Sequence, residues 1–369
     1  MPIVPINAPQ IGKEEIDAVV KVLESGTLTH GLGAGPMVRK FEDEFAKFAE
    51  AKHAIAVNSG TAALHLAVLA VGIKSGDEVI LPSFTFTATA EAVAFVGAKP
   101  VFVDIDPETY NVSPEQIEKA ITKKTKAIIA VDLYGLSSDM QQIRKIAEKH
   151  GLKVIEDAAQ AHGATYRGKP PGAFADAACW SFYASKNMTT GEGGMVTTND
   201  DEIAEKIRCM RSHGEKEKYA SIMLGYNYRM PEMEAAIGSE QLKKLPGFVA
   251  KRRENAERLT KILESAERLK LPREPKGYRH SWYLYTVRLK DSTEKERNNL
   301  VEKLARKGIE ARVFYANPIH LMPYYRSFGK FSLPETEKAS KQVFSLPVHP
   351  GVTPEQIDFI CEAVLHALK

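Results

Sequence analysis

Short apolar runs alternate along the chain with segments whose apolar residues recur at helical spacing. From about Met37, MVRKFEDEFAKFAE is amphipathic, HAIAV is a short apolar run, and TAALHLAVLAVG again has helical spacing. The later runs DEVILP, KPVFVDI, TKAIIAVDLYG and LKVIED are strand-like, and the helix-like segments SPEQIEKAI and SDMQQIRKIAEKHG lie between them. Continuous apolar strands buried on both faces are typical of parallel sheets covered by helices. The pattern therefore predicts an α/β fold, with a large three-layer domain around a mostly parallel central sheet.

The pattern changes after roughly Leu245. A long charged helix is predicted from Gly247 to about Leu269, and LPREPKGYRHSWYLYTVRLK then mixes turn residues with an aromatic strand. The remainder contains the helical STEKERNNLVEKLARKG, the segment GIEARVF and the helical TPEQIDFICEAVLHAL, which indicates a smaller α+β domain. We therefore predict a large domain over residues 1–245 and a small C-terminal domain over residues 246–369.

The composition is that of a folded globular protein. Hydrophobic residues make up 44% and charged residues 26% of the 369 positions, near the average for globular domains. Lysine and arginine total 50 against 47 for aspartate and glutamate, so the formal net charge is +3. No basic block stands out, and we therefore expect no nucleic-acid partner.

The N-terminus and the cysteines predict a cytoplasmic protein. The start MPIVPINAPQIGKEEIDAVV lacks a cationic segment followed by an unbroken apolar stretch, and no later segment reaches the roughly 18 to 20 apolar residues of a membrane helix. Cys179, Cys209 and Cys361 are widely separated and lack CxxC spacing, which suits a reducing compartment. We expect no disulfide, no metal site and no membrane association.

Polar residues that directly follow apolar runs are candidates for chemistry, because an α/β sheet binds ligands at the carboxyl ends of its strands. In AIAVNSGTAALHLAV, the residues Asn58, Ser59, Gly60 and Thr61 separate a strand-like run from a helix. Gly60 permits close approach of a ligand, and free amides at the helix start, with the Thr61 hydroxyl, could hold a phosphate. Alternatively, Ser59 only caps the helix. The segment lacks a Walker lysine and the GxGxxG pattern, which argues against a nucleoside triphosphate or a dinucleotide.

A second candidate place is LKVIEDAAQAHGA, where Glu156 and Asp157 end an apolar strand. A carboxylate at a strand end can pair with a cation such as the protonated ring nitrogen of a bound heterocycle, and the pairing favours its charged form. Asp157 is the better placed of the two. The alternative interpretation is an aspartate that caps a helix.

A third candidate place is SFYASKNMTTGEGGMV, in which Lys186 follows the strand-like run ACWSFY. Gly191, Gly193 and Gly194 permit a tight turn into the next strand. A poorly solvated lysine near other cations loses its proton more easily, and the neutral amine can form a Schiff base. Most lysines are only solvated surface charges, so this segment alone leaves both interpretations open.

One cofactor, pyridoxal phosphate (PLP), needs all three features at once. Its aldehyde condenses with a lysine, its pyridine nitrogen needs an acidic partner, and its phosphate needs an anion site. We therefore expect Lys186, Asp157 and the segment around Gly60 to meet around PLP.

Seven strings of the chain resemble the DegT/DnrJ/EryC1/StrS family, the sugar aminotransferases among the fold type I PLP enzymes. In family order they are SGTAAL, PSFTFTATAEAV, VDIDPETYNV, VIEDAAQAHGA, SFYASKNMTTGEGGM, GYNYRMPEMEAAIG and SLPVHPGVT. The resemblance covers nearly the whole chain. It implies the PLP-dependent transferase fold type I and a homodimer with shared active sites.

The resemblance also implies a role for each matching position. Lys186 would form the Schiff base and carry protons to and from the substrate carbon, and Asp157 would partner the pyridine nitrogen. Gln160 would lie near the phenolic oxygen of the cofactor, and Phe86 would stack on its ring, although core packing is the alternative for Phe86. The phosphate contacts would be Gly60, Thr61 and Ser181, with Asn227 of the other subunit. Without the resemblance, Asn227 is predicted to be a turn residue.

A further set of positions matches regions that contact the sugar nucleotide or the amino donor in the family. These positions are Thr29, His30, Gly31, Arg229, Tyr315 and His320. Arg229 could hold a donor carboxylate through its planar guanidinium group, or form a structural ion pair. His162 and His320 could equally be packed or surface histidines.

We predict a PLP-dependent aminotransferase that moves an amino group, from glutamate, to a keto-sugar carried on a nucleoside diphosphate. A family dehydratase has histidine at the lysine position, and Lys186 argues against it. A keto-inositol acceptor stays open. A non-catalytic PLP or ligand sensor is disfavoured because the sequence shows no helix-turn-helix or basic module, and a nicotinamide enzyme because the glycine fingerprint is missing.

Overall fold

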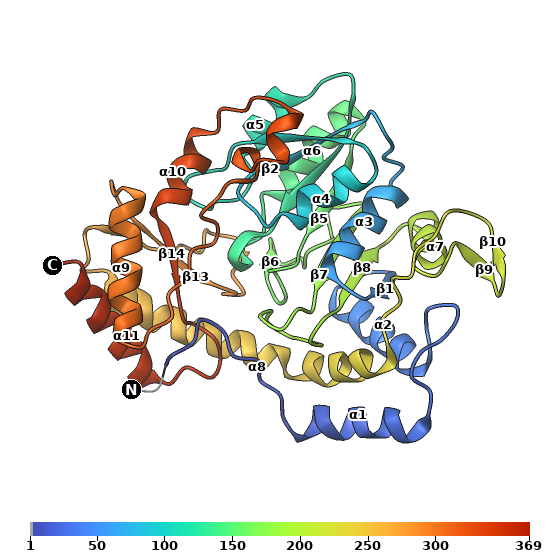
Figure 1. Ribbon diagram of the computed structural model, residues 1–369, viewed down its shortest axis with the longest axis horizontal. Coiled ribbons are helices and arrows are strands. Elements are labelled where there is room, and N and C mark those ends of the chain that lie inside the picture. Colours follow the sequence, from blue (N-terminus) through green and yellow to red (C-terminus); the bar gives the residue numbers. More distant parts are fainter. Residues whose placement is uncertain (1–2) are drawn as a thin grey trace.

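A seven-stranded sheet lies at the centre of the protein, whose computed structural model describes residues 3–369 (Figure 1). In pairing order its strands are β1 (His53–Val57), β8 (Gly194–Thr198), β7 (Ala177–Ser181), β5 (Lys153–Asp157), β4 (Thr125–Val131), β2 (Glu78–Pro82) and β3 (Lys99–Val103). Neighbouring strands from β7 to β3 are parallel, whereas β8 runs antiparallel to both β1 and β7. The predicted α/β fold with a mostly parallel sheet is confirmed.

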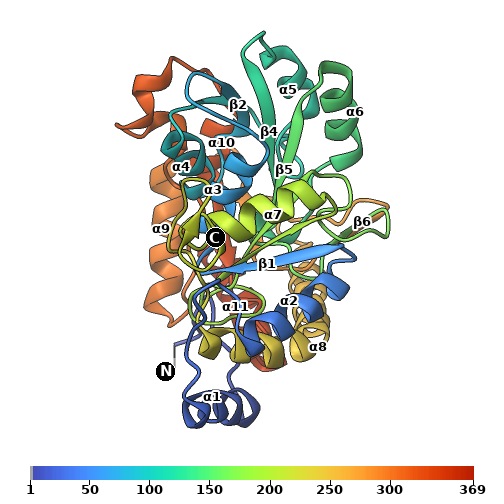
Figure 2. The ribbon, with the colours of Figure 1, turned by 90° about the vertical axis from the view of Figure 1, so that its right-hand side faces the viewer.

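Helices cover both faces of this sheet. They are α2 (Pro36–Phe48), α3 (Gly60–Ala70), α4 (Ala88–Phe95), α5 (Pro114–Ala120), α6 (Met140–His150), α7 (Asp201–Met210) and the long α8 (Glu232–Leu263). Alternate side chains of β1 point to opposite faces: Ile55 and Val57 pack in the core under α3 and α7, and Ala54 and Ala56 pack toward α2. Figure 2 shows β1 between α7 above and α2 and α8 below. These are the three layers that the apolar pattern predicts.

The helix α8 differs from its prediction at both ends. It begins at Glu232 and ends at Leu263, whereas the sequence predicted a helix from Gly247 to about Leu269. Pro246 lies inside the helix, where a proline lacks the amide hydrogen of one helical bond and is usually a break. Contacts with α1 (Lys13–Ser25) and α2 hold the segment before Pro246 in helical form. Because α8 runs through residue 245, the domain division there stays a prediction.

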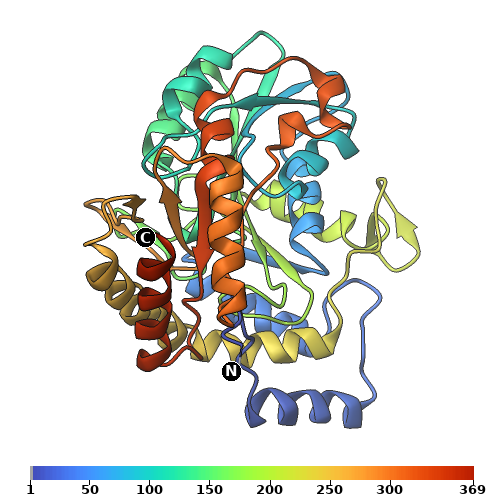
Figure 3. The same ribbon diagram turned by 60° about the vertical axis from the view of Figure 1, so that its left-hand side comes forward.

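A second, antiparallel sheet forms the C-terminal part of the chain. It consists of β11 (Leu269–Lys270), β13 (Tyr285–Leu289) and β14 (Val343–Leu346), with α9 (Glu294–Arg306), α10 (Pro334–Gln342) and α11 (Pro354–Ala367) beside it. Figure 3 shows α9 and α11, in orange and dark red, next to one another on this part of the molecule. Its core also takes in Val4, which pairs with Ile309, so the start of the chain packs on the C-terminal part.

Smaller elements complete the chain. They are the paired strands β6 (Thr165–Tyr166) and β12 (Tyr278–Arg279), the hairpin of β9 (Glu215–Glu217) and β10 (Ala220–Ser221), and the 3-10 turns Leu133–Gly135, Ile319–Leu321 and Tyr325–Phe328. The hairpin projects from the body at the right of Figure 1. Within residues 3–369, each helix is too short or too polar to span a lipid bilayer.

Candidate active site

A pocket of about 620 Å³ opens at the carboxyl ends of the parallel strands, a volume typical of small-ligand sites. Four segments that follow β1, β2, β5 and β7 meet there, and Tyr283, Phe314 and Tyr315 of the C-terminal part close it. The pocket contains Gly60, Thr61, Phe86, Asp157, Gln160, Ser181, Lys186 and Tyr315, all of which the sequence singled out. The shared edge of the sheet is therefore what brings these distant positions together.

The start of α3 has the free amides that an anion site would need. Ser59 caps the helix, because its hydroxyl accepts a hydrogen bond from Ala62 N at 3.1 Å. Among the described residues, the amides of Gly60 and Thr61 donate no hydrogen bond to the protein, as expected for the first helical turn. A side chain at Gly60 would place its Cβ 2.8 Å from the Cβ of Ser181, so only glycine allows this close packing. The capping role of Ser59 and a phosphate site at the free amides are thus compatible.

Asp157 ends β5 with its carboxylate in the pocket. Its Oδ2 accepts a hydrogen bond from Thr89 Oγ1 at 2.8 Å, and its Oδ1 accepts one from Ala159 N at 3.2 Å. Burial raises the pKa of Asp157, whereas these two hydrogen bonds and the charge of Lys186 oppose that rise. A cation placed against this carboxylate would favour its ionised form further.

Glu156 points to the opposite face of the sheet and meets Asp132, at the end of β4. Its Oε2 accepts a hydrogen bond from Gly172 N at 2.6 Å, and both carboxyl groups are buried. Burial raises the pKa of Glu156 to about 7, and burial together with the charge of Glu156 raises the pKa of Asp132. Two buried carboxyl groups in contact cannot both be ionised at low cost, so the pair holds a proton. Glu156 is therefore a structural group outside the pocket.

Replacing Glu156 with glutamine is expected to change how stability depends on pH. Because the folded pKa is raised, the stability contributed by protonated Glu156 is full below its ordinary pKa of 4.5 and is lost as the pH rises through about 7. The glutamine in Glu156→Gln is neutral at every pH and can still accept the hydrogen bond from Gly172 N. The variant should therefore lack the pH-dependent loss of stability, which is on the order of 2 kcal/mol. Urea unfolding at about pH 5 and about pH 8 measures this. An unchanged pH dependence in the variant would contradict the assignment.

Lys186 lies in the loop after β7, and its side chain reaches the same pocket. It is partly buried, and its backbone amide donates to Tyr183 O at 2.9 Å. Gly193 and Gly194 follow in the turn into β8, and a side chain at Gly194 would place its Cβ 2.3 Å from the carbonyl oxygen of Ser59. Glycine at this position therefore lets the lysine loop pack directly on the anion site.

Aromatic and amide side chains form the rest of the pocket wall. Phe86 is 58% exposed at the pocket, so it is not the core residue of the alternative interpretation, and its ring centre lies 6.4 Å from that of Tyr315. Gln160 is buried: its Nε2 donates to Tyr315 Oη at 3.2 Å, and its Oε1 accepts from Tyr134 N at 2.8 Å. The amide of Gln160 is thereby held facing the pocket.

Three of the other predicted residues lie apart from the first pocket. Thr29, Asn227 and Arg229 line a neighbouring hollow of about 440 Å³, which shares only Glu192 with it. Arg229 donates to Ser212 Oγ at 3.0 Å, and Ser212 Oγ donates to Gly31 O at 2.6 Å. This chain of hydrogen bonds ties Arg229 to the loop that carries Thr29, His30 and Gly31. Arg229 makes no salt bridge among residues 3–369, so nothing supports the structural ion pair considered for it.

The two histidines are packed residues. His162 is fully buried against Trp180, and burial lowers its pKa to about 3, so it is neutral. His320 is also buried, with Nδ1 2.7 Å from Ser83 Oγ, and it lines neither the pocket nor the neighbouring hollow. Within residues 3–369, no cluster of histidine, cysteine, aspartate and glutamate side chains could hold a metal ion.

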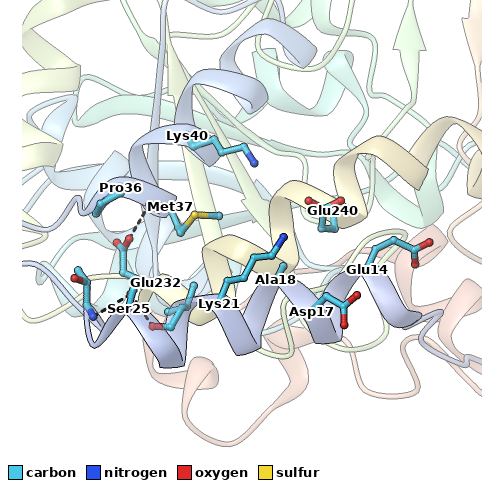
Figure 4. Close-up of a pocket in the computed structure, with 12 residues that line it drawn as sticks. Glu14, Asp17, Ala18, Lys21, Ser25, Pro36, Met37, Lys40, Glu232 and Glu240 are labelled. Carbon is cyan, nitrogen blue, oxygen red and sulfur yellow. Dashed lines mark hydrogen bonds between the residues drawn. The ribbon is translucent and has the colours of Figure 1, made fainter.

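A groove of about 570 Å³ between α1, α2 and α8 contains none of the predicted site residues (Figure 4). Glu232 lies at one end of it and accepts a hydrogen bond from Met37 N at 2.7 Å, which fixes the start of α2 against α8. Lys21 and Lys40 project along it with carboxylates of Glu14 and Asp17 nearby. Charged side chains of both signs line this groove.

The pocket also contains residues that the sequence did not single out, among them Thr89, Ser185 and Tyr283. Thr89 lies in the quoted string PSFTFTATAEAV, but only the fold shows that it donates to Asp157. Ser185 precedes the lysine, and Tyr283 comes from the C-terminal part; their hydroxyl oxygens are 3.0 Å apart. No local signal marks such a contact between distant segments.

The residues present fit PLP. The free amides at α3 suit its phosphate, the buried carboxylate of Asp157 suits its ring nitrogen, and the amine of Lys186 suits its aldehyde. Because position 60 is glycine, Ser181 can lie directly beside the helix start.

Comparison of the sequence with known proteins gives matches along almost the whole chain. The model of the DegT/DnrJ/EryC1/StrS aminotransferase family matches residues 9–365. The pleiotropic regulatory protein of Geobacillus stearothermophilus is 45% identical over 351 residues, which cover 94% of this chain and 93% of that protein. The GDP-perosamine synthase of Caulobacter vibrioides is 40% identical over 371 residues, which cover 99% of this chain and 98% of that protein.

Solved structures also match nearly the whole length of the chain. DesV of S. venezuelae superposes with a TM-score of 0.95 at 37% identity, over 100% of this chain and 99% of its own. Spr1654 of Streptococcus pneumoniae, in its PLP form, superposes with a TM-score of 0.93 at 29% identity, over 99% of this chain and 98% of its own.

Proposed function

Because this chain belongs to the DegT/DnrJ/EryC1/StrS aminotransferase family, a group of PLP-dependent sugar aminotransferases, we propose that it transfers an amino group from glutamate to a keto-sugar carried on a nucleoside diphosphate. One observation carries the proposal: Lys186, Asp157 and the start of α3 converge on a single pocket. The family and its matches identify PLP as the cofactor. The buried free cysteines suit a reducing cytoplasm.

Several pocket residues have a proposed part in binding the cofactor. The bound PLP supplies an aldehyde that accepts amino groups and a ring that takes up electrons. Asp157 holds a proton at the ring nitrogen, and Thr89 and Ala159 keep its carboxylate in place. The amides of Gly60 and Thr61 bind the phosphate, and the exposed face of Phe86 supports the ring.

Lys186 is the proposed proton carrier. Its Nζ would hold the cofactor through the aldehyde and, as a free amine, would move a proton between the substrate carbon and C4′ of the cofactor. The residues Gln160 and Tyr315 lie across the pocket, where their hydrogen bond fixes the wall against which the substrate would lie. The position of the amine within one small pocket supports both functions of Lys186.

The names of relatives suggest the acceptor. A 40% identical relative is a GDP-perosamine synthase, and another is a UDP-N-acetyl-3-dehydro-alpha-D-glucosamine 3-aminotransferase, so both act on sugars linked to nucleoside diphosphates. Arg229 has a guanidinium group suited to a donor carboxylate or a phosphate, and the loop of Thr29, His30 and Gly31 is tied to it through Ser212. We propose that this assembly contacts the substrates.

A homodimer would bring that assembly to the cofactor. Asn227 and Arg229 line a hollow beside the pocket rather than the pocket itself. Large apolar side chains are exposed on the segments that lead to Thr29 and Asn227 in the chain: Ile16, Val20 and Leu23 on α1, Leu28 and Leu32 in the following loop, and Tyr219, Ile222 and Leu224 in and after the hairpin. Figure 1 shows this loop and the hairpin on the same side of the molecule. Exposed apolar patches of this kind are typical of protein interfaces, which supports a second copy here.

Complementation between subunits tests the shared site. Lys186→Ala and Asn227→Asp each remove one half of a composite site, because a carboxylate at 227 repels the cofactor phosphate. Co-expression of the two chains should then restore about a quarter of the wild-type activity, since half of the random dimers carry one intact site. Activity no higher than the sum of the two separate variants would contradict a composite site. As a control, Lys186→Ala is co-expressed with Lys295→Ala, a remote surface substitution, to measure the activity of mixed dimers in which only one chain is impaired.

The proposed reaction is tested by incubating the purified protein with glutamate and a panel of nucleotide-linked keto-sugars, while 2-oxoglutarate formation is followed. Turnover with one or more of these sugars supports the proposal. Turnover with keto-inositols alone would favour a cyclitol aminotransferase. Bound cofactor that glutamate fails to convert to its amine form, with no turnover, would favour a sensor.

A further inference from the structure

The amine of Lys186 lies over the ring of Tyr283. Its Nζ is 4.8 Å from the ring centre, and both side chains line the active-site pocket. Within residues 3–369, the Nζ of Lys186 has no hydrogen-bond or salt-bridge partner. The aromatic face is therefore the direct contact of this amine.

Tyr283 is held in that place by both parts of the chain. Its hydroxyl lies 3.0 Å from the hydroxyl of Ser185, the residue next to Lys186, and its side chain is buried. Its carbonyl oxygen accepts a hydrogen bond from the buried Arg252 at 3.1 Å, just before β13. A ring fixed at its hydroxyl and at its backbone presents one face to the lysine.

The other groups around the amine make no direct contact with it. The charges of Asp157 and Lys186 attract one another, but no hydrogen bond or salt bridge joins them, and the oxygens of Asp157 accept hydrogen bonds from Thr89 and Ala159. Burial lowers the pKa of His162 to about 3 and raises the pKa of Tyr315 well above its usual value, so both are neutral. Glu192 also lines the pocket and is exposed to solvent. The aromatic face attracts an ammonium group but gives no such attraction to a neutral amine.

We propose that Tyr283 is a catalytic residue of the aminotransferase: its ring binds the ε-ammonium of Lys186 whenever this amine is not bonded to the cofactor. The inference rests on the proposed function of Lys186 as a proton carrier. After Lys186 has taken up a proton, it must stay within reach of the substrate carbon and not swing into solvent. The ring of Tyr283 retains the charged form, and the neutral form is free to leave the ring.

Acylation of Lys186 in the full chain stripped of cofactor tests the contact directly. The probe is N-hydroxysuccinimidyl acetate, and peptide mass spectrometry gives the labelling rate of Lys186 relative to the exposed Lys295. Because only the neutral amine reacts, Tyr283→Leu should raise this relative rate by about 2- to 30-fold. Tyr283→Phe keeps the ring and should label at about the wild-type rate. Tyr324→Leu, an exposed tyrosine outside the pocket, is the matched control.

Equal labelling of wild type and Tyr283→Leu, or an equal rise in the phenylalanine and leucine variants, would overturn the proposal. Thermal unfolding verifies that each variant is folded, and Tyr283→Met replaces the leucine variant if that one is not. In the holoenzyme, conversion by glutamate in a single turnover should slow by a similar factor in the variant without the ring, and an unchanged rate would also overturn the proposal. If the labelling rates change as expected but neither the wild type nor any variant transfers amino groups, the proposed function is wrong. The contact between Lys186 and Tyr283 would still be supported.

Discussion

Lys186→Ala is expected to lower the rate of amino transfer by about 10³-fold or more, because one side chain supplies both the covalent link and the proton carrier. The pocket offers no substitute: His162 is neutral and packed behind it, and Arg229 lies in the neighbouring hollow. Single-turnover conversion of the bound cofactor by glutamate, followed by its absorbance, measures the loss. The variant should also lose the absorbance of the lysine-linked cofactor.

Added small amines give this prediction a sharper test. A primary amine such as methylamine can enter a pocket of about 620 Å³ and replace the missing ammonium group in part, so it should restore some of the rate in Lys186→Ala. Lys295→Ala, on the surface of α9, should behave as the wild type and shows that a lost surface charge has no effect. Full activity in Lys186→Ala would refute the assignment of this residue.

Much of the pocket could be predicted from the sequence because its residues follow strands directly. Gly60, Asp157 and Lys186 come after the apolar runs that form β1, β5 and β7, and the parallel pairing of strands puts such positions on one edge of the sheet. The apolar runs could be recognised as strands from the sequence, because strands buried on both faces contain few polar residues. Their position directly after strands explains why the proposed phosphate site at Gly60, the carboxylate of Asp157 and the amine of Lys186 could be predicted.

Contacts between distant segments were not predictable in the same way. Thr89 supports Asp157 from the first turn of α4, and Tyr283 meets Lys186 from the C-terminal part, although nothing in the sequence around either residue marks it. The choice between Glu156 and Asp157 depends on which face of β5 each side chain takes, and that is set by pairing with β4 and β7. The pairing of strands in the folded sheet determines which of the two carboxylates faces the pocket.

In two places, packing against other segments gives a structure that differs from the one the local sequence predicted. The sequence predicted a helix that begins at Gly247, but contacts with α1 and α2 hold α8 in helical form from Glu232 and through Pro246. His320 matched a substrate-contacting region, yet its hydrogen bond with Ser83 and its burial place it outside the pocket. In both cases the surroundings of the residue, which one sequence does not show, determine its part in the structure.

Asp157→Asn is expected to lower amino transfer by about 10²-fold, because a charged hydrogen bond to the cofactor ring is replaced by a neutral amide. The amide keeps the size of the side chain, so the fold and the pocket should persist. Its nitrogen, however, replaces one of the two oxygens and would face the donor of either Thr89 or Ala159, and in both orientations the ring nitrogen has no anion beside it. The loss should appear both in single-turnover rates and in weaker retention of the cofactor during dialysis.

Glu156→Gln is the matched control for this prediction. It removes a carboxylate one position earlier on the same strand, but that carboxylate faces Gly172 and Asp132 on the other side of the sheet. The control should therefore keep its rate and its cofactor, and change only the pH dependence of unfolding. If both substitutions lowered the rate equally, the loss would come from a general effect of charge on the sheet, and Asp157 would have no specific contact with the ring. If only Asp157→Asn lowers it, the alternation of side chains along β5 separates a catalytic carboxylate from a structural one.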